Sequence, residues 1–345
     1  MSFRPRVVLV HGDGPAAWAV AAGLARVGWA VTVRRRVAAG RDVSRIELLA
    51  ASAARFYPYI GLSGNDLKSV AKPCPGTWSC WGYGGPASVD AISSPYGASW
   101  SVDRASFDAL LRARALDMGV VEDSTETLFP KGGSDNWQIL ASGAVSNRAV
   151  APTPTQYDDR LIAFVGCGRL VESCAGLDSR LLIEALPDGW AYGLLGPRGT
   201  VGVAYFTDAL CLAGKDPKVY ATDALYRTER ISRLFGATRQ PLQLAAVPVP
   251  CRWRALRAGP GVVRVGDAHA SFDPVAGRGL WEALRLAAQL SEALSSGANV
   301  LGALEQASRV SYQAYLKQRR KFYADALKRF ETPFWVRRVP SITIG

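Results

Sequence analysis

GDAHASFDPVAGRG, residues Gly266–Gly279, is the stretch that decides the fold of this 345-residue chain. It follows the β-branched run Gly261–Gly266 and precedes Leu280–Ser295, whose apolar periodicity predicts a helix. A glycine-rich turn between a strand and a helix exposes backbone N–H groups beside the positive end of the helix dipole, where negative charge is stabilised. The stretch therefore predicts an α/β fold that holds an anionic ligand at this strand–helix connection.

A second unit of the same kind stands near the start of the chain. Its predicted elements are a strand at Arg6–His11, a helix at Ala16–Val27 and a strand at Ala30–Arg34. The first turn has the spacing Gly12-x-Gly14-x-x-Ala17, whose small residues permit a tight turn and the close approach of a pyrophosphate. An ordinary strand–helix turn is the alternative for the motif alone. With its flanking elements, the motif predicts a dinucleotide-binding β-α-β unit.

The end of the second strand lacks the acidic residue that such a unit normally uses to bind ribose hydroxyls. The sequence there is Val33-Arg34-Arg35-Arg36. An arginine can bind a phosphate or stack on adenine, but it has no acceptor for a hydroxyl group. We therefore expect Arg35 to contact the nucleotide in a different way from the usual acidic residue.

The middle of the chain has a strand pattern without intervening helices. Four apolar runs, LIAFVG, LLIEAL, GWAYGLL and TVGVAYF, lie between Leu161 and Phe206 and predict an antiparallel sheet. Trp190 and Tyr192 alternate along the third run and so face the same side of that sheet. They line an aromatic substrate pocket or belong to the core. The other predicted helical segments are a helix at Asp103–Met118, a helical portion at Pro217–Leu234 and the long basic tract Leu304–Phe330.

Composition excludes several function classes. The chain has 41 basic and 29 acidic residues, a net charge of +12, but no nucleic-acid-binding motif, so we expect no nucleic-acid partner. It has no apolar run of about eighteen residues and no signal-peptide pattern, so we expect a cytoplasmic protein without a membrane span. None of its 6 cysteines has C-x-x-C spacing and only 2 histidines occur, which argues against a metal site and against histidine-based hydrolysis.

Six segments in one order carry a resemblance to a known family. They are Pro95–Leu111, Asp159–Phe164, Glu184–Tyr192, Phe206–Ala209, Gly266–Gly279 and Pro333–Arg338. Together they resemble the LodB-like flavoproteins, within the tryptophan-halogenase and flavin-dependent monooxygenase superfamily. The resemblance spans nearly the whole chain and implies FAD as the cofactor. It also implies a Rossmann-like domain of the glutathione-reductase type, an inserted antiparallel-sheet substrate domain and a C-terminal helical tract.

The resemblance implies a division of the chain into three parts. The FAD-binding domain would be discontinuous and comprise residues 1–72, 97–160 and 250–300. The substrate domain would comprise residues 73–96 and 161–249, and the C-terminal helical region residues 301–345. Segments from both ends of the chain would then serve one nucleotide site.

The resemblance also implies roles for single residues. In these families the aspartate matching Asp267 binds the ribityl chain, and the glycines matching Gly277 and Gly279 let the flavin ring lie against a helix end. An arginine matching Arg104 reaches the FAD phosphates. The expected cofactor contacts are Gly12, Gly14, Ala17, Arg35, Arg104, Gly266, Asp267, Pro274, Gly277 and Gly279. The substrate-pocket candidates are Asp273, Trp281, Trp190 and Tyr192.

The activity that the resemblance implies is FAD-dependent hydroxylation of an aromatic, tryptophan-like group. The substrate would be a small aromatic molecule or a tryptophan of a protein partner, as in the maturation of quinone cofactors. Electrons would come from NAD(P)H or from a flavin reductase. Two alternatives stay open: a flavin-dependent halogenase, and a non-catalytic protein of the same fold that docks a partner through Leu304–Phe330.

Two departures from the family pattern bear on these expectations. The D-A-T-G-R segment, a second adenosine contact in the family, is missing from Arg148–Pro154. Halogenases need a lysine near the flavin tunnel, but Cys74 stands at the matching position and Lys72 lies two residues away. Their Trp-x-Trp-x-Ile-Pro motif is only partly present, at Trp190–Leu195. Halogenation is therefore less expected than hydroxylation.

Overall fold

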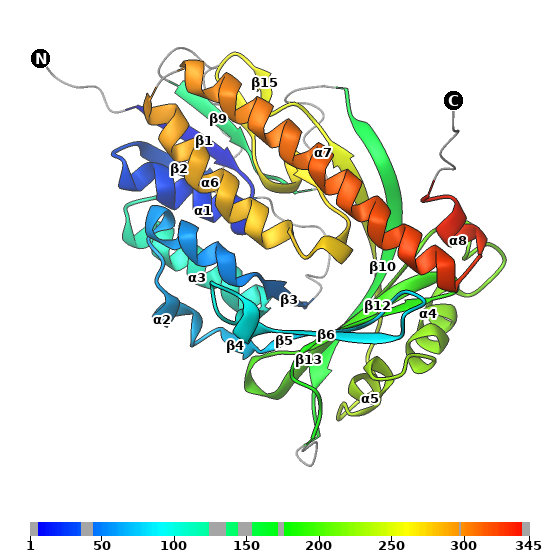
Figure 1. The fold of residues 1–345 in the computed structure, drawn as a ribbon. Helices are drawn as coiled ribbons and strands as arrows, with labels where there is room; N and C mark the ends of the chain where they lie inside the picture. The colour runs from blue at the N-terminus through cyan, green and yellow to red at the C-terminus, as the bar shows by residue number, and fades with distance from the viewer. Residues whose placement is uncertain are drawn as a thin grey trace, which may run out of the picture.

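The computed structural model describes residues 6–35, 44–123, 136–143, 154–171, 176–296 and 298–339. Figure 1 shows two halves, one built on a parallel sheet and the other on a large antiparallel sheet, with the long helix α7 (Ala298–Arg329) running along both. This is the α/β arrangement predicted from the sequence, with an inserted antiparallel sheet and C-terminal helices.

The first half contains a six-stranded sheet in the order β15-β16-β9-β1-β2-β8. Its strands are β1 (Val7–His11), β2 (Ala30–Arg34), β8 (Val121–Asp123), β9 (Asn136–Leu140), β15 (Arg257–Gly259) and β16 (Val262–Arg264). All pair in parallel except β15, which is antiparallel to β16. The strands β1 and β16, far apart in sequence, both pair with β9, so the two predicted strand–turn–helix units share one sheet.

Three helices and a long 3-10 segment pack on this sheet through one apolar core. They are α1 (Pro15–Arg26), α3 (Arg104–Asp117), α6 (Gly279–Ser296) and η1 (Ala51–Ile60). The helix predicted at Asp103–Met118 is confirmed, because the Asp103 carboxylate accepts the backbone N–H of Ser106 and caps α3. The helices predicted at Ala16–Val27 and Leu280–Ser295 are confirmed within a residue at each end.

A small three-stranded sheet joins the two halves. It has the order β3-β7-β4, made of β3 (Ile46–Leu49), β7 (Ser99–Asp103) and β4 (Ala71–Cys74), and α2 (Gly64–Leu67) precedes β4. Ile46 packs so closely on the second half that an added Cβ on Gly202 would lie 2.6 Å from the Ile46 Cβ. The small sheet therefore packs directly against the large sheet.

The second half is an eight-stranded sheet in the order β17-β14-β10-β13-β12-β11-β5-β6. Its strands are β5 (Gly76–Cys80), β6 (Pro86–Asp90), β10 (Gln156–Arg169), β11 (Leu181–Leu186), β12 (Gly189–Leu195), β13 (Thr200–Thr207), β14 (Ala245–Trp253) and β17 (Ala270–Ser271). The four runs predicted as an antiparallel sheet form β10 to β13, and these strands pair with one another in antiparallel fashion. The pairing of β11 with β5 is parallel.

Helices cover both faces of this sheet. On one face lie α4 (Pro217–Tyr226) and α5 (Ile231–Gly236). The helical portion predicted at Pro217–Leu234 is confirmed as these two helices. They are separate because the buried Glu184 carboxylate accepts backbone N–H groups of Glu229 and Ile231, where α5 begins.

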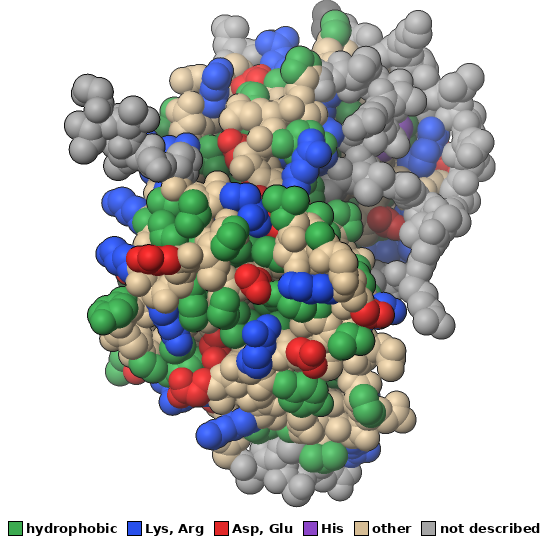
Figure 2. Space-filling view, turned by 90° about the vertical axis from the view of Figure 1, so that its right-hand side faces the viewer, with side chains coloured by type: hydrophobic (Ala, Val, Ile, Leu, Met, Phe, Trp, Pro, Cys, Tyr) green, Lys and Arg blue, Asp and Glu red, His purple; other side chains and the backbone are tan. Residues whose placement is uncertain are grey.

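The other face is covered by α7 and the short helix α8 (Pro333–Val336). The α7 helix begins six residues before the predicted tract Leu304–Phe330 and ends one residue before its end. Within the described part of the chain, no helix is both long and apolar enough to cross a lipid bilayer. On the face shown in Figure 2, cationic side chains are scattered among acidic and hydrophobic ones. The positive net charge therefore forms no continuous basic surface on that face.

Candidate functional site

The turn after β1 can be formed only with glycine at position 12. Gly12 has φ +142°, and an added Cβ would lie 2.4 Å from the carbonyl oxygen of Ala141, at the end of β9. Its N–H donates to the carbonyl of Arg34, and the Trp18 indole donates to the carbonyl of Asp13. These contacts fix the chain as it enters α1.

The amino end of α1 is open. Gly14 is the N-cap of this 12-residue helix, with no side-chain cap and no acidic residue in the first turn. An added Cβ on Gly14 would meet no atom within 4 Å, whereas Ala17, one turn inside, is fully buried. Unbonded N–H groups and a positive helix end facing open space suit an anionic group such as a pyrophosphate.

The second glycine-rich turn lies against the first. Gly266, in the short 3-10 segment η4 (Gly266–Ala268), has φ +57°, and an added Cβ would lie 2.6 Å from the Cβ of Ala16. Any larger residue would push this turn off α1. Gly266 thus brings Asp267 next to the amino end of α1, although more than 240 residues separate them in sequence.

The carboxylate of Asp267 is exposed and receives no hydrogen bond from any described residue. Its backbone carbonyl accepts the Arg252 guanidinium at 3.0 Å, which fixes the main chain. Desolvation raises the pKa of Asp267 above its ordinary value, and the positive charge of Arg104 opposes this rise. A carboxylate that is accessible, partly desolvated and without a hydrogen-bond donor is suited to accept hydroxyl groups of a ligand.

The end of the Gly266–Gly279 loop faces open space. An added Cβ on Gly277 or on Gly279 would meet no atom within 4 Å. Gly277 has φ +58° and ends the 3-10 segment η5 (Pro274–Ala276), in which Pro274 is the first residue, and α6 begins at Gly279. Trp281 lies in the first turn of α6, with its ring edge-on to Phe56 at 5.4 Å. The backbone at the amino end of α6 is therefore open at these two glycines.

Arg104, expected at the cofactor phosphates, lies in an ion cluster. Its Nη1 atom is 2.8 Å from both carboxylate oxygens of Glu47 on β3, and its Nη2 is 3.3 Å from Asp108. The side chain is 14% exposed. Two carboxylates thus neutralise the guanidinium, so a phosphate would meet little free positive charge at Arg104.

Tyr192 and Trp190 share one face of β12, as their alternation predicts, but they differ in environment. Trp190 is fully buried and stacks on Phe206 with ring centroids 4.0 Å apart. Tyr192 is half-buried, and its hydroxyl donates to the carbonyl of Ile46 at 3.1 Å. Trp190 therefore belongs to the core of the sheet, whereas Tyr192 reaches the small sheet that carries Glu47.

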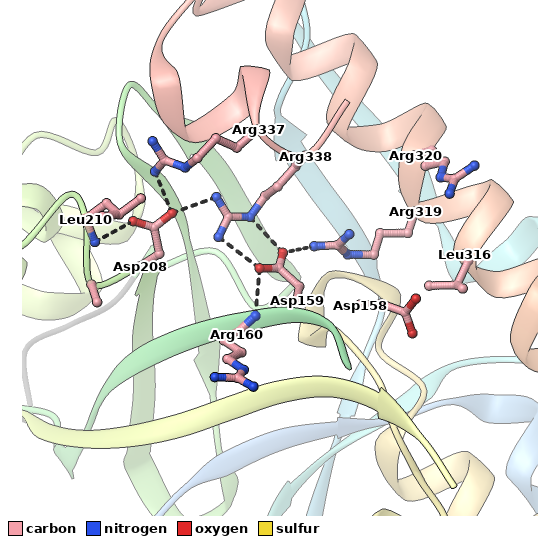
Figure 3. A pocket seen from close by; sticks show the side chains of 11 residues that line it. Asp158, Asp159, Arg160, Asp208, Leu210, Leu316, Arg319, Arg320, Arg337 and Arg338 are labelled. Atoms are coloured by element: carbon pink, nitrogen blue, oxygen red, sulfur yellow. Dashed lines mark hydrogen bonds and ion pairs between the residues drawn. The ribbon is translucent and has the colours of Figure 1, made fainter. Parts of the chain in front are cut away.

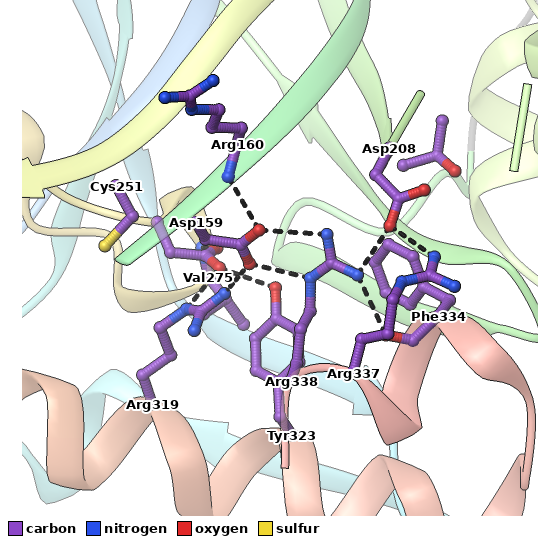
Figure 4. Close-up of polar contacts among 12 residues, drawn as sticks. Asp159, Arg160, Asp208, Cys251, Val275, Arg319, Tyr323, Phe334, Arg337 and Arg338 are labelled. Atoms are coloured by element: carbon purple, nitrogen blue, oxygen red, sulfur yellow. Dashed lines mark hydrogen bonds and ion pairs between the residues drawn. The ribbon is translucent and has the colours of Figure 1, made fainter. Parts of the chain in front are cut away.

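Asp273 is held on all sides and has no exposed side-chain surface. Its carboxylate accepts Arg319 Nε at 2.8 Å and the Tyr323 hydroxyl at 2.6 Å, and also caps Val275. Arg319 and Tyr323 both come from α7, and Figure 4 labels them together with Val275. The Tyr315 hydroxyl accepts the Asp273 N–H at 2.7 Å. In this position Asp273 anchors the loop to α7, and its carboxylate has no free surface to offer a substrate.

The ion cluster around Asp273 continues to the surface. Arg319 also pairs with Asp159, which binds Arg338 at 2.7 Å, and Arg338 binds Asp208 at 2.8 Å. Desolvation raises the pKa of Asp208, but hydrogen bonds from Arg337 and Arg338 outweigh it and lower the value to about 2. The cluster borders a pocket of about 360 Å³ between α7 and the segment after β13 (Figure 3). These ion pairs connect the Gly266–Gly279 loop, β10 and the residues after α8.

The expected adenosine contacts are placed as follows. Arg35 is exposed just beyond β2, and Arg34 pairs at 3.2 Å with Asp123, its register partner on β8. The acidic residue at this sheet edge therefore comes from β8 and not from β2. The segment Arg148–Pro154, which lacks the D-A-T-G-R motif, lies outside the described residues up to position 153.

The halogenase candidate Lys72 and its neighbour Cys74 both lie on β4. The Cys74 thiol is buried and donates to the carbonyl of Gly76. Lys72 borders a pocket formed with the β12–β13 turn, and no residue of the Gly266–Gly279 loop lines that pocket. Within the described ranges, no group of histidine, cysteine, aspartate or glutamate side chains could hold a metal ion.

The sequence patterns do not identify three side chains that hold the predicted site residues in place. Glu47 is the partner of Arg104, and Arg319 and Tyr323 hold Asp273. Glu47 had a detectable signal, a charged residue inside the apolar run Ile46–Leu49. Arg319 and Tyr323 had none, because they belong to a long basic tract in which most charged side chains are solvated.

No protein-family model matches the chain, and no curated protein matches its sequence. Solved structures do match it. A peptidyl tryptophan dihydroxylase, QhpG, essential for tryptophylquinone cofactor biogenesis, aligns with a TM-score of 0.76 at 22% identity over 99% of this chain and 80% of that one. The flavin-dependent halogenase CmlS aligns with a TM-score of 0.81 at 18% identity over 99% of this chain and 68% of that one. PqsL of P. aeruginosa aligns with a TM-score of 0.73 at 16% identity, over 97% of this chain and 98% of that one. At these identities the shared property is the fold.

Proposed function

We propose that this chain is an FAD-dependent monooxygenase that hydroxylates a tryptophan-like aromatic group of a polypeptide. The observation that carries the proposal is the accessible, unbonded carboxylate of Asp267 beside the open amino end of α1, in the same loop as the open positions Gly277 and Gly279. The fold is shared with QhpG, whose name describes a peptidyl tryptophan dihydroxylase. Reduced FAD, when bound, would supply the activation of O₂ that such a hydroxylation needs.

Each part of the site has a role in this proposal. The N–H groups at Gly14 and the start of α1 would bind the pyrophosphate, and Asp267 would accept hydroxyl groups of the ribityl chain. The open space at Gly277 and Gly279 would admit the flavin ring. The positive end of α6 would stabilise negative charge on the reduced ring. Tyr192 and Trp281, both half-buried, would border the substrate.

Halogenation is the second candidate, because CmlS shares the fold. The position of Lys72 favours hydroxylation over it. Lysine-dependent halogenation needs an ammonium group that reaches the flavin, and Lys72 borders a pocket to which the Gly266–Gly279 loop contributes nothing. The two reactions give different products, so one experiment separates them.

The test is to load the purified chain with FAD and follow the flavin absorbance on the protein fraction. The flavin is then reduced chemically, and O₂, chloride and a tryptophan-containing peptide are added. We expect the peptide to gain the mass of oxygen, detected by mass spectrometry. A chlorinated peptide would favour the halogenase instead, and a chain that takes up no FAD would contradict both.

Gly279→Leu is the variant that tests where FAD lies. A leucine side chain would occupy the open space before α6, so we expect FAD uptake to be lost. Gly302→Leu is the matched control, because Gly302 is also in a helix, also faces open space and lies at an exposed position of α7. Equal FAD uptake by the two variants would contradict the proposed position of the ring.

A further inference from the structure

A pocket of about 380 Å³ lies where the small sheet meets the turn between β12 and β13. Its charged lining side chains are Lys68, Lys72 and Arg198, and no lining residue is acidic. Pro73 and Leu195 supply apolar surface. A concave site whose charged side chains are all cationic attracts an anion. The apolar surface suits a ligand that has a nonpolar or aromatic part next to its anionic group.

The positive charge of this pocket is available to a ligand. No described carboxylate pairs with Lys68 or Lys72. Arg198 donates to the Ser106 hydroxyl at 3.1 Å and lies 3.8 Å from the Asp103 carboxylate, with 59% of its side chain exposed. These contacts hold Arg198 beside the amino end of α3 and leave much of its guanidinium free.

The backbone at Arg198 is an independent sign of function. Arg198 has φ 55° and ψ 35°, and no other described residue apart from glycine has positive φ. The turn Gly196–Gly199 requires this left-handed conformation, for which glycine or asparagine is the ordinary choice. Arginine accepts the strain and places a cation at the pocket. Strained residues of this kind concentrate at ligand-binding sites.

We propose that this pocket binds the phosphate group of the nucleotide that donates electrons to the enzyme. The inference rests on the proposed function. Hydroxylation of an aromatic C–H by O₂ gives the phenol and water, and it consumes two electrons and two protons from a donor. The donors of this class, NAD(P)H and reduced flavin mononucleotide, all carry phosphate. The pyrophosphate of FAD itself is accounted for by the separate site at α1.

The test is calorimetric titration of the FAD-saturated chain with inorganic pyrophosphate. We expect saturable binding that weakens with added salt. The double variant Lys68→Ala/Lys72→Ala should weaken binding by at least roughly tenfold, as expected for the loss of charged hydrogen bonds. The control Lys218→Ala/Lys321→Ala removes the same charge from two exposed lysines and should bind like the parent. Equal affinity in both double variants would overturn the proposal.

Arg198→Gly separates binding from folding. Glycine relieves the left-handed strain, so the melting temperature should rise while the affinity for pyrophosphate falls. Changes in opposite directions cannot come from unfolding. An affinity that stays at the parent value would overturn the role of Arg198.

Competition identifies the donor. We expect ADP-ribose, 2′-phospho-ADP-ribose or flavin mononucleotide to displace pyrophosphate, and the one that competes best names the source of the phosphate. If none of the three competes, the donor assignment is overturned. A chain that binds pyrophosphate but takes up no FAD would contradict only the proposed function. A chain that takes up FAD and hydroxylates, but binds no pyrophosphate, would contradict only this inference.

Discussion

Asp267 and Asp273 lie six residues apart in one loop, but their carboxylates have opposite environments. The Asp267 carboxylate is exposed and has no described hydrogen-bond donor, while that of Asp273 is buried and bonded to Arg319, Tyr323 and Val275. The difference shows that one loop can be anchored to the core at one aspartate and accessible to a ligand at the other. The bonds of Asp273 hold Gly277 and Gly279 in place, so that the surface around Asp267 can remain free for a ligand.

The largest expected effect comes from removing the fixed aspartate. Asp273→Ala leaves the buried Arg319 with fewer negative partners and leaves the Tyr323 hydroxyl without its acceptor. We expect the free energy of unfolding to fall by about 3–5 kcal/mol. Urea unfolding followed by tryptophan fluorescence measures it. Asp117→Ala, on the exposed end of α3, is the control. A loss of less than about 1 kcal/mol would mean that the buried contacts do not hold the loop.

The second effect tests the middle of the loop through pH. His269 is buried, its ring bonds Ser308, and burial lowers its pKa from 6.5 to about 4. Between these values the unfolded chain binds a proton that the folded chain excludes, so stability falls as pH falls. From pH 7 to pH 5 we expect His269 to account for a loss of about 2 kcal/mol. His269→Gln should show a correspondingly smaller loss between the two pH values. Identical pH profiles would show that His269 is accessible.

The third effect concerns the free aspartate. Asp267→Ala removes a side chain that makes no described bond, so the free energy of unfolding should change by no more than about 0.5 kcal/mol. FAD affinity, measured by fluorescence quenching, should fall at least about tenfold, the value of one charged hydrogen bond. The comparison with Asp273 would break down if Asp267→Ala unfolded the chain as strongly as Asp273→Ala.

The smallest effect distinguishes the two glycines at the end of the loop. Gly277 has φ +58°, so Gly277→Ala should cost about 1 kcal/mol of stability. Gly279 begins a helix without positive φ, so Gly279→Ala should leave the stability unchanged or slightly higher. Thermal unfolding of the two variants measures the difference. Equal melting temperatures would mean that the conformation at Gly277 relaxes freely.

Local rules explain what the sequence predicted correctly. Asp103 caps α3, as its place before a helical pattern predicts. Gly12 avoids a clash with the chain after β9, and Gly14 leaves the amino end of α1 open. Alternating apolar residues form β10 to β13. Each depends on residues close together in the chain or on a regular repeat. The resemblance also implies that segments from both ends of the chain serve one site, and Gly266 does pack on Ala16.

Long-range pairing explains what could not be predicted. Arg104 was expected at a phosphate, but Glu47, 57 positions earlier, meets it at 2.8 Å. Asp273 was expected at a substrate, but Arg319 of α7 binds it 46 positions later. The break between α4 and α5 within the predicted helical portion Pro217–Leu234 depends on the carboxylate of Glu184, which lies on strand β11. No local pattern indicates which distant charge will meet a given residue.

The order of synthesis gives the anchoring of the loop a further consequence. Arg319 and Arg338 leave the ribosome 40 and 59 positions after Gly279, a delay of about 2 to 12 seconds at ordinary elongation rates. During that delay the loop is present but its anchors are not. Under the proposed function, loading of FAD at this loop would therefore be a late event of biogenesis, completed only after the last helices are translated and docked.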